Sequence, residues 1–100
     1  MDLQRLLKEA QKMQSKVTKV EKELNESEYE GKNGPVAVKI NGKHEVLSVE
    51  IEEDVLTAEN KEMLQDMILL AFNEANAKAN KDREDKMGSV TAGVSIPGVF

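Results

Sequence analysis

Residues 3 to 24, LQRLLKEAQKMQSKVTKVEKEL, determine how this chain begins to fold. Apolar side chains recur there at alternating spacings of three and four residues, namely Leu3, Leu6, Ala10, Met13, Val17, Val20 and Leu24. This is an a/d heptad seam, and neither glycine nor proline interrupts it. The pattern predicts a helix of about 22 residues, roughly 33 Å long. Because so long a helix exceeds what a small globule can cover, we expect part of it to project.

The middle of the chain has the alternation of β-strands. Val36, Val38 and Ile40 alternate with Ala37 and Lys39, and a second run follows from His44 to Ile51. Asn41-Gly42 between the runs predicts a two-residue hairpin turn, in which Val36 would lie opposite Leu47. That register leaves Ser48 to Ile51 unpaired, available to a weaker first strand at Glu28 to Glu30 or to another chain.

The last part of the chain predicts a second long helix. Thr57 is placed to cap it, and apolar residues from Leu64 to Ala79 follow a helical period. Gly88 is expected to end it. Residues 89–100 are uncharged and contain too few apolar groups to order themselves, so we expect a flexible tail after a single domain of residues 1–88.

Composition excludes several classes of protein. The chain has 100 residues, which is room for one core, and a formal net charge of −5. The absence of cysteine removes disulfides and thiolate chemistry. We see no export signal and no apolar run long enough for a membrane span, so we expect a cytoplasmic protein.

No residue cluster predicts catalysis, a metal or a cofactor. His44 is the single histidine and is more simply a solvated strand residue than a general base. The carboxylates of residues 52–54 lack the spacing of a calcium loop, and Gly31 and Gly34 fit a tight turn better than a phosphate cradle. We therefore expect neither an enzyme nor a small-molecule binding site.

A row of cations is the feature that does suggest a function. Five basic residues follow the helical period on the first helix: Arg5, Lys8, Lys12, Lys16 and Lys19. Their mean direction lies about 135° from the apolar seam, so packing and charge occupy separate faces. This row is either a surface for a polyanion or an ordinary solvated face. Gln4, Gln11 and Gln14 flank it and offer amide groups.

The acidic net charge does not exclude DNA. Residues 25–60 hold nine acidic and three basic side chains, whereas residues 1–24 hold four acidic and six basic ones. Since charges are screened over about 8 Å in physiological salt, the first helix acts as a local cation. With two arginines and three aromatic residues, the chain suits lysine contacts to duplex phosphates better than guanine readout or base stacking.

Seven short motifs follow one another along the whole chain: LLKEAQKMQ at 6–14, ING at 40–42, VEI at 49–51, MLQDM at 63–67, AFNEA at 71–75, KMG at 86–88 and IPG at 96–98. In this order they resemble the YbaB/EbfC family of bacterial nucleoid-associated proteins. No single motif is diagnostic, but their order is specific.

The resemblance implies an α+β protomer with a long N-terminal helix, a three-stranded antiparallel meander and a long C-terminal helix. It also implies a tweezer-like homodimer that binds duplex DNA, alters its conformation and contributes to nucleoid organisation and gene regulation. It does not say which residues touch DNA. We assign the row on the first helix, with a second group on the last helix: Lys78, Lys81, Arg83 and Lys86.

Two alternatives remain at this point. Two long helices flanking a hairpin also suit a prefoldin-like module that grips protein clients through the apolar seam. A purely structural coiled-coil dimer would use the same seam. Neither of these would bind DNA.

Overall fold

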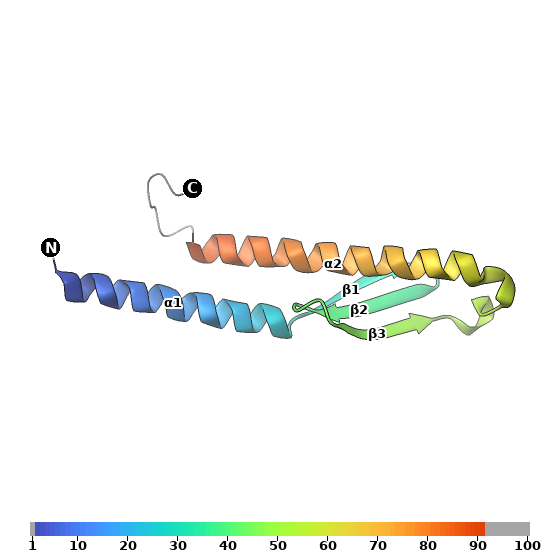
Figure 1. The fold of residues 1–100 in the computed structure, drawn as a ribbon, viewed down its shortest axis with the longest axis horizontal. Helices are drawn as coiled ribbons and strands as arrows, with labels where there is room; N and C mark the ends of the chain where they lie inside the picture. Colours follow the sequence, from blue (N-terminus) through green and yellow to red (C-terminus); the bar gives the residue numbers. More distant parts are fainter. Residues whose placement is uncertain (1, 92–100) are drawn as a thin grey trace.

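The computed structural model describes residues 2–91, and it has two long helices joined by a small sheet (Figure 1). The elements are α1 (Leu3–Glu26), β1 (Glu28–Asn33), β2 (Val36–Asn41), β3 (Val46–Ile51) and α2 (Lys61–Thr91), with two short 3-10 turns before α2. The expected α+β order is confirmed. The molecule is elongated, with extents of 71 × 24 × 13 Å.

Helix α1 has a defined start and end. The Asp2 carboxylate accepts a hydrogen bond from the backbone N–H of Gln4 at 3.1 Å, which satisfies one of the free amides of the first turn. At the other end, the Ser27 hydroxyl donates to the carbonyl of Glu23 at 2.7 Å. Helix α1 therefore extends two residues beyond the predicted Leu24.

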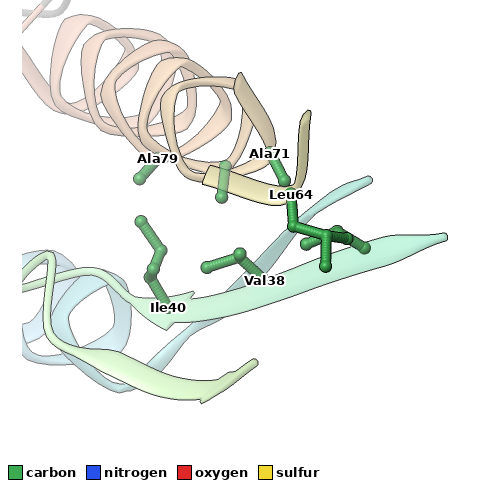
Figure 2. Packing of buried hydrophobic residues seen from close by; sticks show 7 residues of the cluster. Val38, Ile40, Leu64, Ala71 and Ala79 are labelled. Carbon is green, nitrogen blue, oxygen red and sulfur yellow. The ribbon is translucent and has the colours of Figure 1, made fainter. Parts of the chain in front are cut away.

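The core lies between one face of the sheet and α2 (Figure 2). Val36, Val38 and Ile40 of β2 are at most 1% exposed, so the alternation predicted from sequence is confirmed. Opposite them, α2 presents a small-residue row, Ala71, Ala75 and Ala79, together with Leu64. These alanines let the helix approach closely. A Cβ on Gly31 of β1 would overlap the carbonyl oxygen of Ala71.

The predicted register of the β2–β3 hairpin is wrong. Val36 pairs with Ile51 rather than with Leu47, and a bulge lies in the ladder after the Lys39–Ser48 pair. The reason is the side chain of Asn41. Its Oδ1 accepts hydrogen bonds from the backbone N–H groups of Lys43 (2.9 Å) and Glu45 (3.1 Å). These bonds stabilise a loop that is wider than a two-residue turn. The positive φ of this loop falls at His44, and β3 has no unpaired overhang.

Gly42 has a different role from the one predicted. A Cβ at this position would overlap the carbonyl oxygen of Leu24 near the end of α1. Leu24 is fully buried. Glycine is therefore required here because the hairpin loop and α1 touch backbone to backbone.

Both predicted ends of the second helix need correction. The side chain of Thr57 makes no capping hydrogen bond, and α2 begins only at Lys61, after a 3-10 turn over Ala58–Asn60. Helix α2 continues through Gly88 to Thr91. An interior glycine weakens a helix by about 1 kcal/mol but ends it only when the next turn is unfavourable. The predicted tail thus begins too early, and residues 92–100 lie outside the described part.

The third strand is the least covered element of the sheet. Helix α2 packs on β1 and β2. Val46 and Val49 of β3 remain 52% and 45% exposed, and the outer edge of this strand has no partner within residues 2–91.

Candidate nucleic-acid interface

Three segments that are distant in sequence meet at the base of α1. Arg83 of α2 donates from Nη2 to the side-chain oxygen of Asn25 at 2.7 Å and to the carbonyl of Gly42 at 3.2 Å. One guanidinium therefore connects the end of α1, the hairpin loop and α2. From this junction α1 extends away from the sheet and beyond the end of α2 (Figure 1).

The face of α1 that holds the cations is open. We call Arg5, Lys8, Lys12, Lys16 and Lys19 the basic stripe; all five are exposed. Within residues 2–91, the four lysines form no ion pair. The Nε atom of Arg5 lies 3.8 Å from Oε1 of Glu9, but both side chains are largely exposed, and such a pair contributes little to stability. The stripe thus presents cations whose charge is not neutralised by the protein.

The apolar seam occupies a different side of α1. Its members Met13, Val17 and Val20 are half-buried, and α1 contacts α2. Leu3 and Leu6, nearer the N-terminus, are 72% and 45% exposed. The separation of seam and stripe that the sequence predicted is therefore present in the fold.

The second group of basic residues does not form a comparable surface. Lys78 donates to the carbonyl of Glu30 at 2.8 Å and pairs with Glu74, and Lys86 pairs with Asp82 at 3.2 Å. Lys81 and Arg83 point in directions about 160° apart on the helix. Lys78, Arg83 and Lys86 are therefore engaged by other groups of the fold, and the four residues do not present one cationic face.

A polar pair that the sequence gave no reason to select lies beneath α2. The Tyr29 hydroxyl donates to Oδ2 of Asp82 at 2.6 Å. Burial, and then this bond to Asp82, raise the pKa of Tyr29 above its usual value. The bond in turn lowers the pKa of the Asp82 carboxyl. Because the partners are 53 residues apart, only the three-dimensional fold brings them together.

The features that suggested chemistry remain apart. His44 is exposed in the hairpin loop. Over the described range there is no group of three His, Cys, Asp or Glu side chains placed to hold a metal. A hollow of about 600 Å³ lies between the end of α1 and the hairpin loop. It is open and is lined by side chains of both charges, among them Glu21, Lys22, Lys43 and Glu45. Neither helix within residues 2–91 has a stretch apolar enough to span a bilayer.

The geometry defines a class of protein: a helix–sheet–helix fold with a projecting cationic arm. Residues 1–94 match the YbaB/EbfC DNA-binding family, and the chain belongs to that family. The family resemblance noted from the sequence motifs is thereby confirmed.

Named relatives agree with this assignment. The chain is 44% identical to a nucleoid-associated protein of Clostridium novyi, over 100% of this chain and 90% of that protein. It is 42% identical to a nucleoid-associated protein of Alkaliphilus metalliredigens, over 99% and 89% of the two chains. Among solved structures, an uncharacterized protein from Helicobacter pylori has the same fold, with a TM-score of 0.73, 23% identity, and coverage of 89% and 96%.

Proposed function

We propose that this protein binds duplex DNA through the basic stripe of α1, mainly by lysine contacts to phosphates and with modest sequence preference. One observation carries the proposal: Lys8, Lys12, Lys16 and Lys19 are exposed on one face of a projecting helix and have no ion-pair partner among residues 2–91. Arg5, Lys78, Lys81 and Lys86 are secondary candidates. Arg83 is the weakest candidate, since its guanidinium holds the junction.

Charge distribution supports a polyanion as the partner. Residues 3 to 19 contain five basic side chains and one acidic side chain, whereas the whole chain carries −5. A lysine several turns out along α1 lies more than a Debye length of about 8 Å from most of the acidic middle. The arm therefore attracts phosphate even though the protein as a whole is acidic.

We also infer that the functional unit is a homodimer with projecting arms. The exposed edge of β3, with Val46 and Val49 uncovered beside it, offers backbone hydrogen-bonding groups and apolar area to a second copy. Leu56 and Leu69 are also more than half exposed. Within residues 2–91 these groups have no cover, which favours a partner with the same surface.

The family and the names of the relatives support a role in the nucleoid. We propose that the protein is cytoplasmic and nucleoid-associated, that it alters DNA conformation, and that it contributes to nucleoid organisation and gene regulation. The proposal includes neither an enzymatic activity nor a cofactor, a membrane or a small-molecule substrate.

A gel shift with duplex DNA at two salt concentrations, combined with sedimentation equilibrium, tests the proposal. We expect a shifted complex that weakens as salt rises, because neutralised phosphates release counterions. A protein that ignores duplex DNA but suppresses the aggregation of an unfolded client would instead be the holdase-type module considered above.

A further inference from the structure

Helix α1 has a third face that neither packing nor the basic stripe uses. Gln4, Leu7, Gln11 and Gln14 fall on it, and we call it the glutamine face. At 100° per residue, its centre lies about 120° from the seam and about 120° from the basic stripe. The three faces therefore divide the helix almost evenly.

Leu7 is the first indication that the glutamine face has a partner. It is outside the heptad seam and 63% exposed. No core residue of the described fold packs against it. An exposed leucine alone is ordinary, but this one lies among amides on a helix that projects from the body.

The amides beside Leu7 have no partner either. Gln4, Gln11 and Gln14 are all exposed. Across residues 2–91, none of their side-chain amides forms a hydrogen bond; Gln4 and Gln14 take part only through their backbone groups. Each amide offers a donor and an acceptor side by side.

The glutamine face is confined to the free part of the arm. It lies on the first half of α1, which extends past the end of α2 (Figure 1). Closer to the sheet the same side of the helix carries Thr18 and Lys22 in place of glutamines. Within residues 2–91, the amide-rich portion thus coincides with the cationic portion of α1 that no other described element flanks.

We propose that the glutamine face enters the major groove of the duplex whose phosphates the basic stripe contacts, and that it favours A·T pairs. This inference rests on the proposed function. The major groove, about 12 Å wide, admits an α-helix. The long lysine side chains of the basic stripe, on the flank of such a helix, would then extend toward the phosphates that border the groove. A glutamine amide pairs with N6 and N7 of adenine, and an apolar side chain contacts the thymine methyl group.

The test compares two duplexes of equal length, one A·T-rich and one G·C-rich, over a salt series. The variant Gln4→Ala/Gln11→Ala is compared with the parent and with Gln65→Ala, an exposed glutamine of α2. We expect the parent to prefer the A·T-rich duplex, and the double variant to lose about fivefold or more of that preference. The salt slope should stay unchanged, since no phosphate contact is removed.

A second comparison isolates Leu7. Replacing thymine by uracil in the A·T-rich duplex removes only the methyl group, so it should weaken the parent and leave Leu7→Ala unaffected. Circular dichroism verifies that each variant keeps its helix content.

The outcomes separate this inference from the proposed function. If the parent binds both duplexes equally, or if Gln4→Ala/Gln11→Ala keeps the parent's preference, the groove assignment is overturned while phosphate binding stands. If replacing thymine by uracil leaves the affinity of the parent unchanged, the contact between Leu7 and the thymine methyl group is overturned. If the parent binds no duplex at any salt concentration, the proposed function fails as well.

Discussion

Replacing two lysines of the basic stripe gives the most direct test of the interface. In Lys12→Ala/Lys16→Ala, both side chains removed are exposed and lie away from the seam. Alanine is at least as good a helix former as lysine, so the free energy of unfolding should change by less than about 0.5 kcal/mol. A change in DNA affinity would then reflect the interface.

The magnitude follows from counterion release. We expect roughly four to six phosphate contacts per dimer, since not all eight stripe lysines reach one duplex, and each contact contributes about −0.9 to the slope of log affinity against log salt. The parent slope should therefore lie between about −3.6 and −5.4. Between 50 and 200 mM salt this is a loss of roughly 150-fold to 2000-fold in affinity. Each engaged arm of the variant loses two contacts, which flattens the slope by about 1.8.

The assay measures affinity for two unrelated duplexes by fluorescence anisotropy across the salt series. Phosphate contacts carry no sequence information, so the variant should weaken on both duplexes by the same factor. Lys61→Ala, an exposed lysine of α2, is the matched control. If the double variant keeps the parent's affinity and slope, the stripe is only a solvated face and the reasoning is refuted.

Three further predictions address the assembly and the packing. Sedimentation equilibrium should give about twice 11.1 kDa, and Val49→Lys on β3 should shift the protein toward monomer; a monomeric parent would contradict the dimer. Tyr29→Phe should lower the free energy of unfolding by about 1 kcal/mol, measured by urea titration. Because the pKa of Tyr29 is raised, the parent should lose stability as pH rises above about 10, and this variant should lose less; an equal loss in both would exclude Tyr29 as the cause. Gly31→Ala should cost about 3 kcal/mol or more in thermal unfolding, because the backbone of Ala71 occupies the space; a neutral result would mean that α2 is free to shift.

Local periodicity predicted the helices and strands of this fold because each depends on the spacing of residues that are close in sequence. The heptad spacing located α1, and the alternation of Val36, Val38 and Ile40 located the buried face of β2. The register of the hairpin was not accessible in the same way. Asn-Gly suits a two-residue turn, but an asparagine side chain can also organise a wider loop, and local preference does not separate these two structures.

The candidate site was predictable only where it lies on one helix. The spacing of Lys8, Lys12, Lys16 and Lys19 places them on one face whatever the rest of the chain does. Lys78 and Arg83 donate hydrogen bonds to Glu30 and Asn25, which lie 48 and 58 residues away in the sequence. Their sequence positions alone therefore suggested free cations. Tertiary contacts decide which cations remain available.

The junction at the base of α1 makes the arm a lever. From Leu24 to Leu3 the helix axis spans about 32 Å. A rotation of about 5° at the Arg83–Asn25–Gly42 junction would move the tip by roughly 3 Å, close to the axial rise between successive phosphates of one strand. The two hydrogen bonds donated by the Arg83 guanidinium therefore help to fix the direction of α1 and with it the position of every cation on the arm. Arg83 can therefore influence where the lysines of the basic stripe are positioned through its bonds at the junction.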